Sequence, residues 1–209
     1  MNQGVNQIEG FLNIVRGRRS IRKFRQDPVP KEVVRNIIEA ASWAPSASNR
    51  QDWEFRVVTS SPLKEKMKTI VRSYWESALN QTRSEAIREE LQKYISMFDW
   101  FSHAPALIII SAKRPESFLY HILGDTADDV AGTEISAAMA SQNLMLAAHA
   151  SGIGSCCVTG PLAAQEELKE LLEIGKGRKI VCLIALGYPA EQPEAPTRKS
   201  VEKILKYIE

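Results

Sequence analysis

The sequence predicts one domain of mixed helix and strand, of the α/β or α+β class, in which helices flank a sheet. Three observations lead to this class. The 209 residues suffice for one well-packed core. Several helical segments separate the strand-like runs, and no tight hairpin joins two strands, which favours a sheet covered by helices. No internal repeat, low-complexity tract or linker divides the sequence, so we expect a single domain over residues 1–209.

Three strands are expected from short apolar runs bounded by turn-forming residues. The runs are "WEFRVVT" (53–59), "PALIIISA" (105–112) and "KIVCLIALGYP" (179–189). The second run is apolar almost throughout, so it is expected to be buried in the sheet.

Helices are expected where apolar residues recur at helical spacing, or where serine and proline mark a first turn. The expected helices lie at 8–17, within 27–46 up to Pro45, from Ser60 or Ser61 onward, within 83–101, at 133–151, from Pro161 onward and at 198–208. The helix at 133–151 is apolar almost all round, which is typical of a helix at the centre of a fold. Residues 114–132 show no clear period and are expected to form a loop with some helix.

Charge and cysteine content exclude several classes of protein. The formal net charge is +2, so the chain lacks the overall basic character of a nucleic-acid binder. Three cysteines without a C-x-x-C pair indicate a reducing compartment rather than a disulfide or zinc framework. His103, His121 and His149 have no metal-ligand spacing. With no signal pattern and no apolar run of membrane length, we expect a soluble, cytoplasmic protein.

A basic cluster, "GRRSIRKF" (17–24), stands out against this near-neutral background. A helical turn would place Arg18 and Arg22 on one face, where two guanidinium groups and the Ser20 hydroxyl suit phosphate oxygens. The alternative is an ordinary solvated basic turn, because runs of charge are usually surface.

Three further stretches allow either binding or purely structural roles. The loop "PSASNRQ" (45–51) carries donors and acceptors that suit the polar edge of a planar heterocycle, or it simply ends a helix. Glycines in "SGIGSCCVTGP" (151–161) permit close approach of a flat ligand, or form a helix cap and turn. Gln142 and Asn143 lie within the apolar helix, where a ligand or a backbone group must satisfy a buried amide.

Taken together and in order, these stretches resemble the flavin-dependent nitroreductase family. The matching motifs are "RRSIRKF", "AASWAPSASNRQDWEFRVVT", "ISAAMASQNLMLAAHASGIGSCCVTG", "IVCLIALGYP" and "TRKS". The resemblance runs from about residue 10 to 205 and is weak over 72–103 and 113–130. It implies an α+β three-layer sandwich, with a central, mainly antiparallel sheet flanked by helices. It also implies an intertwined homodimer with FMN at the interface.

The resemblance further implies cofactor-binding roles for individual residues. The FMN phosphate, ribityl chain or pyrimidine edge is assigned to Arg18, Arg19, Ser20 and Arg22, with further phosphate contacts from Arg198, Lys199 and Ser200. The partner chain is expected to supply Pro45, Ser46, Ala47, Ser48 and Asn49, with Gln51 nearby. Val158, Thr159 and Gly160 are expected along the isoalloxazine near N5, and Gln142 beside the flavin or supporting that segment.

The implied activity is an FMN-dependent NAD(P)H oxidoreductase working by a ping-pong mechanism. NADH or NADPH delivers a hydride to flavin N5, and a nitroaromatic, quinone or similar electron-poor acceptor is then reduced. No catalytic side chain and no metal are expected. Two alternatives remain: a specialised flavoenzyme of the same fold, such as a dehalogenase, ring dehydrogenase or flavin-fragmenting enzyme, and a flavin-binding protein without turnover.

The sequence departs from the usual family pattern at two positions. Asp52 stands where many members have proline, and Cys157 stands where many have tryptophan. The aromatic stretch around Trp100 and Phe101 suits either a lid over the flavin or packing in the core or a dimer interface.

Overall fold

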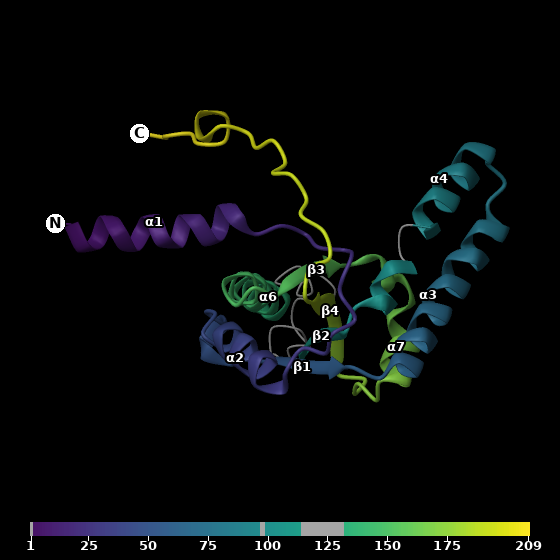
Figure 1. The fold of residues 1–209 in the computed structure, drawn as a ribbon. Helices are drawn as coiled ribbons and strands as arrows, with labels where there is room; N and C mark the ends of the chain where they lie inside the picture. The colour runs from purple at the N-terminus through teal and green to yellow at the C-terminus, as the bar shows by residue number, and fades with distance from the viewer. Residues whose placement is uncertain (1, 97–98, 114–131) are drawn as a thin grey trace.

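A four-stranded antiparallel sheet forms the middle layer of the computed structural model, which describes residues 2–96, 99–113 and 132–209 (Figure 1). Its strands are β1 (Trp53–Val58), β2 (Ala106–Lys113), β3 (Gly154–Val158) and β4 (Arg178–Gly187), in the spatial order β1-β2-β4-β3. Every pairing in this sheet is antiparallel. The α+β class and the antiparallel sheet expected from the sequence are therefore confirmed.

The three predicted strands are present, and β3 is a fourth that the sequence analysis did not predict. Residues 152–160 were expected only as a glycine-punctuated turn. The short run Gly154–Val158 pairs along its whole length with β4, from Gly154 opposite Gly187 to Val158 opposite Leu183. Its conformation therefore depends on a strand that lies far along the chain.

One face of the sheet is covered by α2 (Lys31–Ser42) and α6 (Gly132–Ala150). Small buried residues on α6, among them Ala137 and Ala140, let this helix pack closely against α2 and the sheet. The expected central position of the apolar helix is confirmed, although Ile135 and Met139 stay exposed on the single chain.

The opposite face is covered by α3 (Ser61–Gln81), α7 (Gln165–Leu171) and the short 3₁₀ helices η2 (Asp99–His103) and η4 (Gly160–Ala164). Ser60 caps α3, as predicted, by accepting a hydrogen bond from the backbone N–H of Leu63 at 3.4 Å. Phe101 is completely buried here and Trp100 packs against the same core. The aromatic stretch therefore belongs to the core and not to a lid. Helix α4 (Glu85–Ser96) lies against α3.

Both chain ends extend away from these layers (Figure 1). Helix α1 (Asn2–Gly17) begins earlier than predicted. The closing helix expected at 198–208 is wrong, because only the short 3₁₀ helix η5 (Val201–Lys203) forms there. Residues 194–209 are all exposed, so nothing buries the apolar side that would stabilise a helix. The loop expected at 114–132 lies almost wholly outside the described residues.

Across the described ranges, no helix has the length and apolar character needed to cross a membrane.

Candidate functional site

The basic segment is extended and lies along the edge of the sheet. Helix α1 ends at Gly17, so the helical turn that would place Arg18 and Arg22 on one face does not form. Instead, Ser20 forms a parallel bridge with Ser155 of β3, and the N–H of Ile21 donates to the Ser155 carbonyl at 3.0 Å. The segment therefore covers the free edge of β3 and places its basic side chains beside that strand.

A pair of glycines makes room for this segment. Gly154 of β3 lies directly opposite Gly187 of β4. A Cβ on Gly154 would come within 3.0 Å of Ile21, and a Cβ on Gly187 within 2.5 Å of Pro105 and 3.0 Å of Phe24. Side chains at these two positions would push the segment away, so the paired glycines determine how closely the basic segment approaches the sheet.

The carboxylate of Glu191 holds the same segment from the other side. Its Oε1 accepts hydrogen bonds from the backbone N–H groups of Arg22 at 2.6 Å and Lys23 at 3.0 Å. Partial burial acts to raise the pKa of Glu191. The two backbone hydrogen bonds and the nearby charges of Lys23 and Arg22 outweigh that effect, so the pKa is lowered. The carboxylate is thus engaged by the backbone.

A cavity of about 650 Å³ opens beside this segment. It is lined by Gly17, Arg18, Arg19, Ile21, His149, residues 152–155 and residues 189–193. The Arg19 guanidinium folds back onto the carbonyls of Arg16 at 2.6 Å and Arg18 at 2.8 Å, where it caps the end of α1. Among the described residues, the Arg18 guanidinium has no hydrogen-bond or ion-pair partner. It is therefore available to an anion.

Arg22 and Ser20 lie close to the thiol of Cys156. Burial raises the pKa of this thiol, and Arg22, the Ser20 hydroxyl and Arg18 act in the opposite direction. Two arginines and a hydroxyl therefore surround one point on β3. The Ser155 hydroxyl next to them is buried and has no hydrogen-bond partner.

His149 is a cavity residue that the sequence analysis set aside. It lies in the last turn of α6, next to Gly17, and lines the cavity with the two arginines. Burial lowers the pKa of His149, and Arg18 and Arg19 lower it further. The ring is therefore neutral at pH 7 and offers a hydrogen bond rather than a charge. Its position two residues before the end of the expected helix was the only sequence signal.

The second group of predicted site residues lies at the other end of α6. The loop at 45–51 contains the 3₁₀ helix η1 (Ala47–Asn49), and the N–H of Ala47 donates to the Ser136 hydroxyl of α6 at 3.2 Å. A shallow hollow of about 610 Å³ is lined here by Trp43, Pro45, Asn49 and Gln51, together with Glu39, Ser42 and Ala44. Within the loop, the Ser46 hydroxyl accepts from the Gln51 N–H at 3.1 Å, and Gln51 Nε2 donates to Asn49 Oδ1 at 3.1 Å.

Within one chain, the two groups cannot contact the same small molecule. The 19 residues of α6 span about 27 Å, with the loop near its first turn and the basic segment near its last. One chain therefore carries two separate halves of the predicted site.

The remaining predicted residues are placed as follows. Gln142 is exposed on α6, so the expectation of a buried amide is wrong there, while Asn143 reaches the Ala40 carbonyl at 3.5 Å. Val158 is buried in the core, Thr159 is exposed, and the Gly160 carbonyl accepts a hydrogen bond from Trp75 Nε1 at 3.3 Å. Arg198, Lys199 and Ser200 lie in the exposed tail, away from the cavity.

Adjacent cysteines alternate between the two faces of β3, as expected of a strand. Cys156 is buried, whereas Cys157 is exposed and lies close to Cys182 of β4. All three cysteines are free, and the described part of the chain contains no cluster of ligands for a metal ion.

The nitroreductase family model matches residues 15–188, a range that includes the basic segment, the loop and all four strands. The chain belongs to the nitroreductase family.

Named relatives of this family member have different activities. It is 32% identical to a NADH dehydrogenase of Thermus thermophilus, over 90% of this chain and 91% of that protein. It is 30% identical to an iodotyrosine deiodinase of Nematostella vectensis, over 93% of this chain and 74% of that protein.

The fold of this chain is also similar to that of solved structures. A BluB-like flavoprotein from Clostridium difficile superposes with a TM-score of 0.85 at 26% identity, covering 95% of this chain and 98% of that one. An oxidized iodotyrosine deiodinase bound to FMN and 3-iodo-L-tyrosine superposes with a TM-score of 0.74 at 22% identity, covering 95% and 99%. These likenesses confirm the nitroreductase-like fold.

Proposed function

We propose that this protein is an FMN-dependent oxidoreductase that uses NADH or NADPH to reduce nitroaromatics, quinones or similar electron-poor acceptors. Membership of the nitroreductase family and the NADH dehydrogenase relative support an oxidoreductase. The observation that carries the proposal is the cavity beside β3, where the Arg18 guanidinium lacks a partner among the described residues. The three free cysteines of the protein fit a reducing compartment such as the cytoplasm.

Arg18, which lines the cavity, and Arg22 and Ser20, which lie beside the Cys156 thiol of β3, fit the phosphate end of FMN. Arg18 and Arg22 can each grip phosphate oxygens with two N–H groups, and the Ser20 hydroxyl adds a further donor. Glu191 Oε1 accepts two backbone N–H groups of this segment and makes no side-chain hydrogen bond to Arg18 or Arg22 among the described residues. The partnerless Ser155 hydroxyl leaves a polar atom beside β3 that a polar ligand group would satisfy.

When bound, FMN supplies the hydride chemistry, and the protein supplies binding and orientation. The backbone at 158–160 continues from the end of β3 that is farther from the Ser20–Ser155 bridge, and we assign it to the ring end of the flavin. Positive charge of the arginines beside the bound flavin would stabilise negative charge that develops on reduction. No side chain is assigned as an obligatory acid or base.

We further propose that two chains form the complete site. Helix α6 is about 27 Å long, with the loop at 45–51 near its first turn and the basic segment near its last, so a second chain has to bring its loop to this chain's cavity. The single chain also leaves many large apolar side chains exposed, which is typical of a surface that another chain covers. They are Ile8, Phe11 and Val15 on α1, Ile135 and Met139 on α6, and Val201, Ile204, Leu205, Tyr207 and Ile208 in the tail.

The first test is an anaerobic absorption spectrum of the purified protein before and after addition of NADH or NADPH. Yellow protein that bleaches with one donor and regains colour with a nitroaromatic or quinone is the expected result. Yellow protein that responds to neither donor would contradict the reductase and favour a flavin-binding protein. Colourless protein that FMN does not reconstitute would contradict the cofactor itself.

A second test addresses the phosphate contacts. The double variant Arg18→Ala, Arg22→Ala is expected to fold but to lose bound FMN, because the phosphate loses its charge-assisted hydrogen bonds. The matched control is Arg35→Ala, Arg83→Ala, which removes the same charge from exposed positions of α2 and the α3–α4 turn. Flavin content and circular dichroism are measured for both. Full flavin retention by the first variant would contradict the assignment.

Reductive dehalogenation is a second candidate activity, favoured by the deiodinase relative that matches 93% of this chain. Turnover with 3-iodo-L-tyrosine and release of iodide, measured beside nitroaromatic reduction, separates the two activities. Efficient iodide release with slow nitro reduction would favour the specialised enzyme. The reverse pattern would favour the general reductase.

A further inference from the structure

The loop between Ser46 and Asp52 has an unusual backbone. Ser48, Asn49 and Gln51 all have left-handed φ angles, of 52°, 52° and 51°, and none of them is glycine. Side chains with a Cβ rarely adopt this region, and such conformations persist only where the surroundings hold them. The contacts that hold this loop therefore determine which surface it presents.

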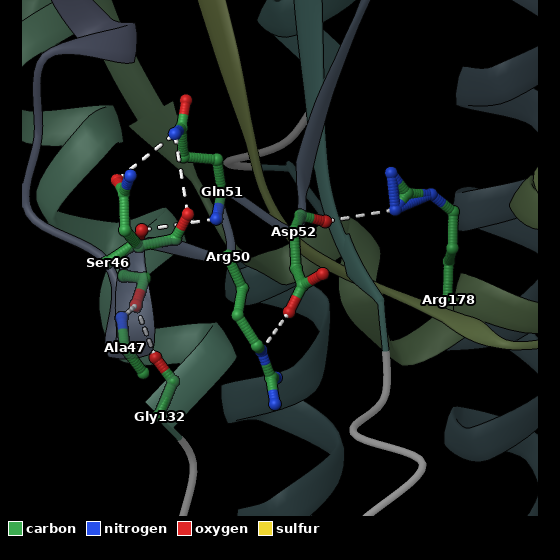
Figure 2. Close-up of polar contacts among 9 residues, drawn as sticks. Ser46, Ala47, Arg50, Gln51, Asp52, Gly132 and Arg178 are labelled. Carbon is green, nitrogen blue, oxygen red and sulfur yellow. Dashed lines mark hydrogen bonds and ion pairs between the residues drawn. The ribbon is translucent and has the colours of Figure 1, made fainter.

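The first end of the loop is attached to α6 (Figure 2). The Ala47 N–H donates to the Ser136 hydroxyl at 3.2 Å, and that hydroxyl donates to the Gly132 carbonyl at 2.5 Å. The Ser46 hydroxyl accepts from the Gln51 N–H at 3.1 Å, which closes the loop on itself.

The second end is attached through Asp52 (Figure 2). Its carboxylate Oδ2 lies 2.7 Å from Arg50 Nε. Its backbone carbonyl accepts from Arg178 Nη1 at 3.0 Å and from the Lys113 N–H at 3.1 Å. Arg178 also binds Glu54 at 3.1 Å and is largely buried. Asp52 therefore connects Arg50, which lies between two left-handed residues, to a fixed point at the ends of β2 and β4.

We propose that Asp52 is a positioning residue for the cofactor site. By holding Arg50, it keeps Ser48, Asn49 and Gln51 in the left-handed arrangement, in which Gln51 Nε2 donates to Asn49 Oδ1 at 3.1 Å, and so fixes the surface that this loop presents to the flavin bound by the second chain. This inference rests on the proposed function. Without the Asp52 carboxylate, the loop relaxes toward ordinary conformations, and FMN then binds only to the fraction of molecules that keeps the competent one.

Global stability is not expected to depend on this pair. Arg50 is 41% exposed and Asp52 23%, and partly exposed ion pairs contribute little to the free energy of unfolding. Loss of the Asp52 carboxylate should therefore change the conformational order of the loop and the FMN affinity, and not the free energy of unfolding. A residue that only stabilised the fold would show the opposite pattern.

The test compares Asp52→Asn with Asp27→Asn. Arg25 and Asp27 form an ion pair with the same sequence spacing and a similar distance, 2.8 Å, on the exposed surface outside the loop. Amide hydrogen exchange of the peptide that contains residues 46–51 is measured in FMN-free protein. FMN affinity is measured by fluorescence titration, and unfolding by urea.

We expect faster exchange in this peptide and an FMN dissociation constant raised about tenfold for Asp52→Asn, with an unchanged urea midpoint. Asp27→Asn should have the exchange rate, FMN affinity and urea midpoint of the wild type. The double variant Arg50→Gln, Asp52→Asn should have the same exchange rate and FMN dissociation constant as Asp52→Asn alone, because the carboxylate acts through Arg50.

Three results would overturn the proposal. Exchange and affinity of Asp52→Asn that equal those of Asp27→Asn would remove the role of Asp52. Faster exchange with unchanged FMN affinity would show that the Arg50–Asp52 ion pair does not affect FMN binding. The proposed function would remain intact. Wild-type protein that takes up no FMN would overturn the proposed function, and this inference with it.

Discussion

Glu191 shows how a single residue can hold a binding segment in place. Its carboxylate accepts hydrogen bonds from two backbone N–H groups, those of Arg22 and Lys23. A glutamine in its place could still accept both hydrogen bonds but would carry no charge. An alanine would leave both N–H groups without this acceptor.

We predict that Glu191→Ala lowers the free energy of unfolding by about 1 kcal/mol at pH 7, because one partly exposed acceptor is lost. The lowered pKa of Glu191 means that the charged form stabilises the fold above the pKa of the unfolded chain. That stabilisation is lost as pH falls below the unfolded-chain pKa and through the lowered folded pKa. Urea unfolding at several pH values between 7 and 3 measures this pH dependence of the free energy of unfolding.

The comparison variants are Glu191→Gln and Glu194→Gln. Glu191→Gln should lose less stability on acidification than the wild type, because it has no charge to neutralise. Glu194 lies nearby in the exposed tail, and its variant should follow the wild-type profile. A Glu191→Gln profile identical to that of the wild type would refute the role of the charge.

At the scale of elements, the approach of the basic segment to β3 and β4 depends on the glycine pair. Gly187→Ala places a Cβ within 2.5 Å of Pro105 and 3.0 Å of Phe24, neither of which can move without shifting its neighbours. We predict a loss of about 1–3 kcal/mol in unfolding free energy, typical of overpacking, and weaker FMN binding because the segment is displaced.

Gly177→Ala is the matched control, since nothing lies within 4 Å of its added Cβ. Thermal unfolding measures the stability of both variants, and flavin titration measures their FMN affinity. Equal stability and equal FMN affinity would show that the segment tolerates the extra methyl group, and that the glycine pair does not set its position.

At the scale of the whole molecule, helix α6 separates the loop at 45–51 from the cavity beside the basic segment. Two chains in a symmetric dimer would then form two sites, each with the cavity of one chain and the loop of the other. A defect in the cavity and a defect in the loop should therefore complement each other when they lie on different chains.

We predict that Arg18→Ala, Arg22→Ala and Asn49→Ala, Gln51→Ala each bind FMN poorly alone. Co-expressed with two different tags and purified as mixed dimers, they should contain one intact and one doubly defective site, and recover about half of the wild-type flavin content. Flavin absorbance per dimer is the measurement. No recovery in mixed dimers, or a monomer that holds stoichiometric FMN, would contradict the shared site.

Local patterns in the sequence determined most of the secondary structure. Apolar residues such as Val34, Ile37 and Ala41 recur at helical spacing, and runs such as "ALIII" show a buried strand, so α2, α6, β1, β2 and β4 could be predicted. Ser60 and the proline after it located the start of α3. The residue types around the cavity and in the loop were also visible in the sequence, because their order resembles a family.

Only the tertiary structure decided how those residues are arranged, since the decisive contacts are not local. Strand β3 forms because β4 pairs with it, and Arg22 is held by Glu191, 169 positions away. The expected helix at 198–208 fails because the tail has nothing to pack against in one chain. The length of α6 is a local property, but its ends separate the loop from the cavity only after the chain has folded around it.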